Sequence, residues 1–118
     1  MTTGKVFHNL IDGEWVESRT GQTFENLNPA DTRDVIGVFQ RSGEQDVVDA
    51  IEAAKRAFEK WRLVPAPRRA EILYAASEML IDHKEEFAHD MNCEMGKVLK
   101  ETRGDVQEAI DTGYYMAG

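Results

Sequence analysis

The feature that most constrains the fold of this sequence is an excess of one-sided helices over strands. Residues 1–41 hold only short strand candidates separated by turns, whereas residues 42–118 carry apolar side chains at helical spacing almost throughout. None of the strand candidates is a long Val/Ile-rich run suited to a central parallel sheet. Because an apolar helix face packs against another layer, either the helices bundle on one another or further sequence supplies the missing layer.

Short strands and turns are predicted for the first region. Asp12-Gly13 predicts a hairpin turn, because both central positions of a type I′ turn need a positive φ, which Gly tolerates and Asp partly does. Pro29 cannot donate to a strand ladder, so residues 28–32 are predicted as a loop. The predicted strands are residues 6–11, 15–16, 23–27 and 35–39.

About four helices are predicted for residues 42–118. The first is expected to open with a capping box of Ser42 and Gln45, and the third with a capping box of Asp82 and Glu85. In such a box, each side chain accepts a hydrogen bond from the backbone N–H of the other residue.

The remaining helix boundaries follow from proline and glycine. Pro67 suits the first turn of the second helix, and Gly96 suits a left-handed C-cap for the third. The fourth helix is expected to begin near Val98 or Leu99. The apolar stripe of the first helix comprises Val47, Ile51, Ala54, Phe58 and Trp61. The second helix is expected to bury Ile72, Leu73, Ala76, Met79 and Leu80.

The charge of the chain argues against two classes of partner. Its 14 basic and 22 acidic side chains give a formal net charge of −8. A nucleic-acid partner requires clustered Lys and Arg to replace phosphate counterions, and an anionic membrane surface also attracts basic residues. We therefore expect neither nucleic acid nor a membrane as a partner.

The N-terminus and the cysteine content predict a cytoplasmic protein. Residues 1–5 lack the basic and then apolar layout of a secretion signal. No apolar run approaches the roughly 20 residues needed to span a bilayer. Cys93 is the single cysteine, which excludes an intramolecular disulfide framework.

Cys93 is the obvious candidate nucleophile, but its surroundings oppose that role. A thiol becomes reactive when a base or a helix N-terminus stabilises the thiolate. Cys93 lies late in a predicted helix, beside Glu94 and near the negative end of the helix dipole. We interpret it as a small side chain that fills space in the helix.

The same helix carries a possible metal-binding stripe. Glu85, His89 and Cys93 are spaced i, i+4 and i+8, so they share one face. His and Cys one turn apart can share a metal ion, yet a zinc site needs further ligands. Because the sequence has no second Cys or His cluster, we interpret the stripe as a solvated face.

Two further groups of residues resemble functional sites but lack the surrounding sequence that such sites need. Gly96 and Gly104 lack the strand, Gly-rich turn and helix that hold a phosphate; we interpret them as a helix cap and a close-packing position. A carboxylate cluster could supply an acid and a base, but a pocket is needed, and a solvated face is the simpler interpretation. That cluster comprises Glu101, Asp105, Glu108 and Asp111. No catalytic, cofactor-binding or metal-ligating residue is therefore predicted.

Several motifs occur in one characteristic order. Glu94-Met95-Gly96-Lys97 is followed by Glu101 and by Gly104-Asp105-Val106. This pattern resembles the E-M-G-K … E … G-E-V signature of the aldehyde dehydrogenase superfamily, with Asp105 where Glu is usual. Other segments that resemble the family are residues 9–16 (NLIDGEWV), 24–30 (FENLNPA), 46–58 with Trp61, and 68–73 (RRAEIL).

The resemblance implies an α/β parent fold with a Rossmann-type cofactor domain, of which residues 1–118 would be the N-terminal part. Residues 1–41 would form its strand and hairpin region and residues 42–118 its helical region, with the catalytic domain absent. The family oxidises aldehydes to carboxylic acids with NAD or NADP through a cysteine thiohemiacetal. Its nucleophile loop and cofactor motifs lie downstream of the matched region, so no functional residue is transferred to this chain.

Two functional hypotheses follow. In the first, the chain is the N-terminal segment of an NAD(P)-dependent aldehyde dehydrogenase. The substrate would be an aldehyde, and the resemblance of residues 104–111 to branches of the family that handle semialdehydes favours a semialdehyde. The parent enzyme would be a homo-oligomer, dimer or tetramer. The segment alone would be inactive. In the second, the chain is a stand-alone helical module that self-associates through its apolar stripes and has no catalytic activity. A small independent enzyme that uses Cys93 or His89 is the weakest interpretation.

Overall fold

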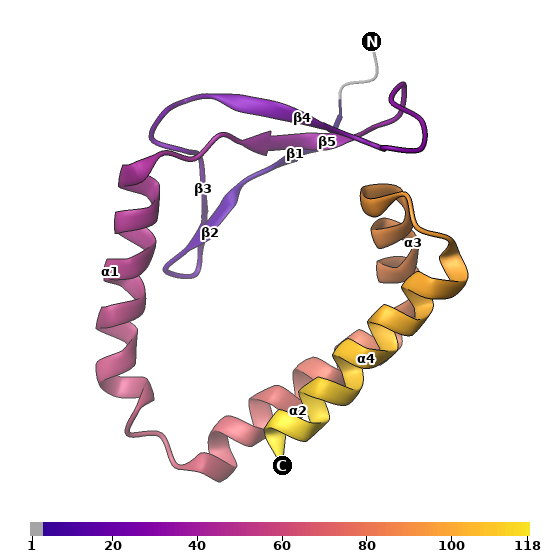
Figure 1. Cartoon of the computed structure of the whole chain (residues 1–118). Helices are drawn as coiled ribbons and strands as arrows, with labels where there is room; N and C mark the ends of the chain where they lie inside the picture. The colour runs from indigo at the N-terminus through magenta and orange to yellow at the C-terminus, as the bar shows by residue number, and fades with distance from the viewer. Residues whose placement is uncertain (1–3) are drawn as a thin grey trace. The chain divides into compact units, whose positions relative to one another are not determined.

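The computed structural model describes residues 4–118, with the strands preceding the helices along the chain (Figure 1). The described residues form two compact units, one up to Leu63 and one from Val64. As predicted, all described strands end by Gln40, and the first helix begins at Glu44. Residues 1–3, which belong to the segment expected to lack a secretion signal, lie outside the described residues.

The first unit contains a three-stranded sheet in the order β1-β5-β4. The strands are β1 (Val6–Phe7), β4 (Thr23–Leu27) and β5 (Val35–Gln40). β1 is parallel to β5, with Val6 opposite Val38, and β4 is antiparallel to β5. The rings of Phe7 and Phe39 stack with centroids 4.7 Å apart. Gly37 lies beneath the Phe7 ring, where a Cβ atom would overlap it.

A separate hairpin joins β2 (Asn9–Ile11) to β3 (Glu14–Val16). Its turn is confirmed, since Asp12 and Gly13 have φ of 55° and 80°. The prediction of one continuous strand over residues 6–11 is wrong. The strand breaks at His8 because β1 pairs with β5, whereas β2 pairs with β3.

Helix α1 (Glu44–Trp61) follows the sheet. The predicted capping box of Ser42 and Gln45 is wrong, because the N-cap is Gly43. The Asp46 carboxylate accepts a hydrogen bond of 2.8 Å from the Gly43 N–H. The helix therefore begins one residue later than the Ser42 cap implies.

The second unit consists of α2 (Ala66–Asp82), α3 (Lys84–Met95) and α4 (Leu99–Ala117). Pro67 lies in the first turn of α2, and Gly96 ends α3 with a φ of 70°, as predicted. The predicted capping box of Asp82 and Glu85 is wrong, since α2 continues through Asp82 and the N-cap of α3 is His83. No helix of residues 4–118 is both long and apolar enough to cross a membrane.

The core of the second unit is small. Ala88, Val106 and Ile110 are buried, and they are flanked by partly buried Leu80, Met91, Leu99 and Tyr114. Ser77 of α2 is also buried, and it lies against Gly113 of α4. The apolar contribution is modest, since burial of Val106 and Ile110 contributes about 1.5–3 kcal/mol each and the methyl group of Ala88 contributes less.

Much of the apolar surface predicted to be buried is exposed. In α2, Ile72 is 56% and Met79 is 63% exposed, so the predicted burial of this face is wrong; Leu73 and Ala76 are exposed too, whereas Leu80 packs on the core. The apolar stripe of α1 is likewise exposed. The periodicity identified the apolar sides of these helices correctly, but within residues 4–118 little packs against them.

Candidate functional site

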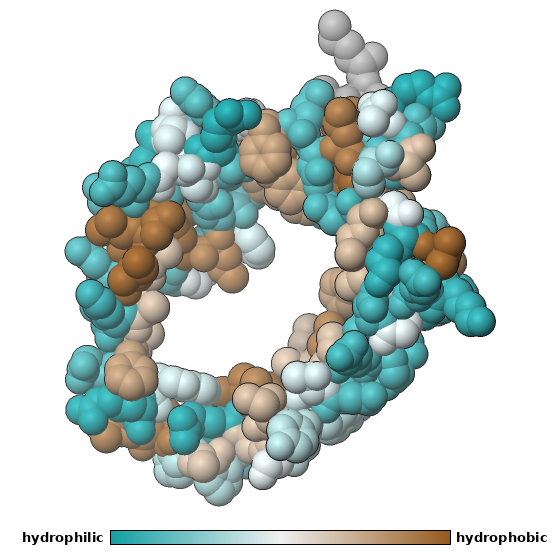
Figure 2. Space-filling model, in the orientation of Figure 1, coloured by the Kyte–Doolittle hydropathy of each residue, from teal (hydrophilic) through white to brown (hydrophobic). Residues whose placement is uncertain are grey.

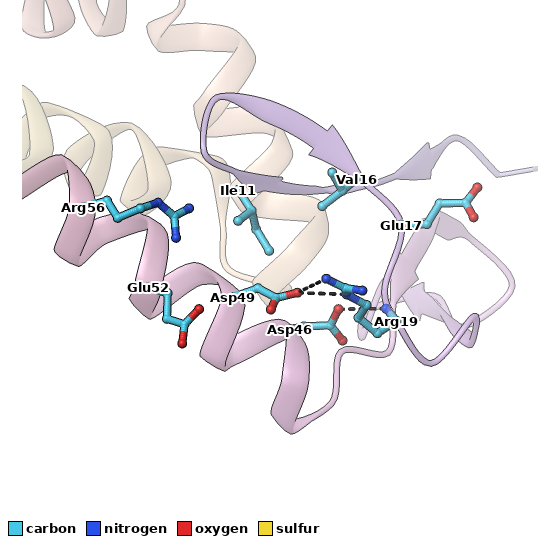
Figure 3. Close-up of a pocket in the computed structure, with 8 residues that line it drawn as sticks. All are labelled: Ile11, Val16, Glu17, Arg19, Asp46, Asp49, Glu52 and Arg56. Atoms are coloured by element: carbon cyan, nitrogen blue, oxygen red, sulfur yellow. Dashed lines mark hydrogen bonds and ion pairs between the residues drawn. The ribbon is translucent and has the colours of Figure 1, made fainter.

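A polar hollow of about 390 Å³ lies in the first unit, between the hairpin and α1 (Figure 3). Ile11 and Val16 line it from the hairpin, and Glu17 and Arg19 line it from the segment that follows β3. Helix α1 contributes charged side chains at helical spacing, Asp46, Asp49, Glu52 and Arg56.

Asp46 is the most enclosed of these groups, at 4% exposure. Its carboxylate accepts hydrogen bonds of 2.8 Å from the Arg19 N–H, the Gly43 N–H and the Ser18 hydroxyl. These donors stabilise the ionised form, chiefly the Arg19 N–H, and so lower the pKa of Asp46 below its ordinary value. One carboxylate thus caps α1 and binds the segment that follows β3.

Arg19 and Asp49 make the second contact across the hollow. The Arg19 Nε donates to the Asp49 carboxylate at 2.9 Å, and an Arg19 terminal nitrogen lies 2.8 Å from the same oxygen. The Gln45 side-chain amide, followed by Arg19, lowers the pKa of Asp49. Arg56 pairs with Asp12 of the hairpin turn at 3.3 Å. Both are exposed pairs, whose contribution to stability is small.

The hollow is suited to holding two segments together rather than to catalysis. A general acid or base at neutral pH needs a pKa near 7, whereas the hydrogen bonds of Asp46 and Asp49 shift theirs in the opposite direction. The lining residues include no Cys, His, Ser or Lys that could act as a nucleophile. We call the contacts of Ser18, Arg19, Gly43, Asp46 and Asp49 the α1 clamp.

The junction of β5 and α1 does not fit a dinucleotide phosphate, although it has the order strand, turn and helix. A helix N-terminus binds phosphate through its free N–H groups and positive dipole end. Here the Asp46 carboxylate accepts from the Gly43 N–H and places a negative charge at that end. The described residues therefore offer no cofactor cradle at this junction.

The candidates identified from the sequence do not converge. Cys93 is half-buried near the C-terminus of α3. Glu85, its predicted stripe neighbour, pairs instead with Arg103 at 2.9 Å. Within residues 4–118, no group of three or more His, Cys, Asp or Glu side chains could hold a metal ion.

The acidic face of α4 is solvated, as predicted. Glu101, Glu108 and Asp111 are exposed. Asp105 is partly exposed and accepts a hydrogen bond of 2.6 Å from Lys97, which raises the pKa of that lysine. Gly96 caps α3, whereas a Cβ on Gly104 would meet open space, so Gly104 is not the close-packing position that was predicted.

Sequence patterns did not identify Ser18, Arg19 or Asp46. A local signal existed for Asp46, since Asp at the third helical position can accept from the N-cap N–H in the manner of a capping box. No local pattern links it to Ser18, because that hydrogen bond spans 28 positions.

Comparison with known proteins gives one consistent result. Residues 15–118 match the sequence pattern of the "Aldehyde dehydrogenase family". The chain is 42% identical to malonate-semialdehyde dehydrogenase 2 of Geobacillus kaustophilus, covering 100% of this chain and 24% of that protein. It is 40% identical to alpha-ketoglutarate semialdehyde dehydrogenase of Haloferax volcanii, covering 92% and 23% respectively.

Solved structures that resemble this chain are also aldehyde dehydrogenases. An NAD-dependent aldehyde dehydrogenase from Sinorhizobium meliloti matches with a TM-score of 0.92 at 26% identity, over 98% of this chain and 23% of that one. A betaine aldehyde dehydrogenase from Staphylococcus aureus, in complex with NAD+, matches with a TM-score of 0.90 at 33% identity, over 94% and 22%.

These likenesses assign the chain to an α/β fold class. The chain spans about a quarter of the length of the curated relatives it matches. It belongs to the aldehyde dehydrogenase family.

Proposed function

We propose that residues 1–118 form the N-terminal part of the cofactor-binding domain of an NAD(P)-dependent aldehyde dehydrogenase. The observation that carries the proposal is the family match over residues 15–118, together with relatives that are about four times as long. The complete enzyme oxidises an aldehyde to a carboxylic acid and reduces NAD or NADP. We expect residues 1–118 to supply scaffold to that reaction, because the Asp46 carboxylate is bonded by backbone N–H groups and occupies the N-terminus of α1, where a phosphate would bind.

We further propose a semialdehyde as the substrate. Relatives at 40–42% identity are named for malonate semialdehyde and alpha-ketoglutarate semialdehyde, both of which carry a carboxylate at the end of the molecule opposite the aldehyde. The residues that would recognise this carboxylate belong to the complete enzyme. The complete enzyme is expected to be a cytoplasmic homo-oligomer, dimer or tetramer. A nucleic-acid partner is not expected, given the net charge of −8.

The test is an assay of the complete polypeptide that carries residues 1–118. With NAD or NADP, malonate semialdehyde should give reduced cofactor, seen by its near-ultraviolet absorbance. Propanal, which has the same carbon count and no carboxylate, is the matched control and should react more slowly. A folded complete protein that binds neither nicotinamide cofactor contradicts the proposal, and faster oxidation of propanal contradicts the semialdehyde assignment alone. Residues 1–118 by themselves should reduce no cofactor.

A further inference from the structure

We draw no further inference here: the strongest candidate, the apolar hollow of about 490 Å³ lined by Ala76, Met79 and Leu80 of α2 and Phe87 of α3, is an unpartnered apolar surface like the one that Figure 2 shows over α1, and nothing in the structure shows what covers it.

Discussion

Gly113 of α4 faces Ser77 of α2 so closely that a Cβ atom at position 113 would overlap the Ser77 hydroxyl oxygen. Ser77 is 1% exposed and donates to the Leu73 carbonyl at 3.0 Å. The two helices therefore pack with a glycine at their point of close approach, as closely packed helices do where a side chain would separate the backbones.

Gly113→Ala should lower the free energy of unfolding of the 118-residue chain by about 1–3 kcal/mol, because the added methyl group overpacks this crossing. Gly104→Ala is the matched control in the same helix, where a Cβ meets open space. It should raise stability by about 0.5–1 kcal/mol. Urea unfolding followed by circular dichroism measures the free energy of unfolding of both variants. An unchanged free energy of unfolding for Gly113→Ala would mean that α2 and α4 are further apart than described.

Asp46→Asn should lower the thermal unfolding midpoint by several degrees. The amide retains the shape of the side chain but loses its charge. Because the Arg19 and Gly43 N–H groups bond different carboxylate oxygens, the NH2 group of Asn places a donor against one of these two donors. Asp49→Asn weakens only solvent-exposed contacts, with Arg19 and Gln45, and should have a much smaller effect. Equal shifts for the two variants would show that Asp46 is not the principal contact of the α1 clamp.

Acid should destabilise the folded chain in part because the Asp46 carboxylate becomes protonated. Its folded-state pKa lies below the ordinary value of 3.8, so its contribution to stability is present above that value and is lost as the pH falls through the folded-state pKa. Unfolding midpoints measured from neutral pH downwards should fall more steeply for the wild type than for Asp46→Asn. An equal dependence of the unfolding midpoint on pH in the wild type and in Asp46→Asn would contradict the role of Asp46 in acid destabilisation.

Cys93→Ala should leave the turnover of the complete enzyme within about twofold of the wild type, because Cys93 lies far along α3 and belongs to no catalytic group among the described residues. Steady-state rates with the semialdehyde measure this. A loss of activity with unchanged thermal stability would indicate that Cys93 takes part in catalysis.

Local chemistry predicted much of the fold. Asp12-Gly13 and Gly96 adopt the positive φ values that their turn and cap require, and the helix limits follow from proline, glycine and periodicity. The errors arose where tertiary partners decide between local alternatives. Gly43 rather than Ser42 caps α1 because Asp46 is held there by Ser18 and Arg19 as well.

Burial was the least predictable property. The stripes containing Val47, Ile72 and Met79 are apolar as expected, yet these side chains are exposed. Periodicity reports which side of a helix is apolar, but it does not report whether the polypeptide that covers that side is within the same 118 residues. The α1 clamp was unpredictable for a related reason, since its hydrogen bonds join residues far apart in sequence.

The parallel pairing of β1 with β5 determines the order in which the first unit assembles during synthesis. Val6 leaves the ribosome well before its partner Val38, and translation at about 5–20 residues per second separates them by seconds. The β2–β3 hairpin needs only local contacts and closes in about 1–10 μs. β1 therefore has no strand partner while the nascent chain grows. Its backbone N–H and C=O groups stay exposed to chaperones and to neighbouring nascent chains until β5 emerges.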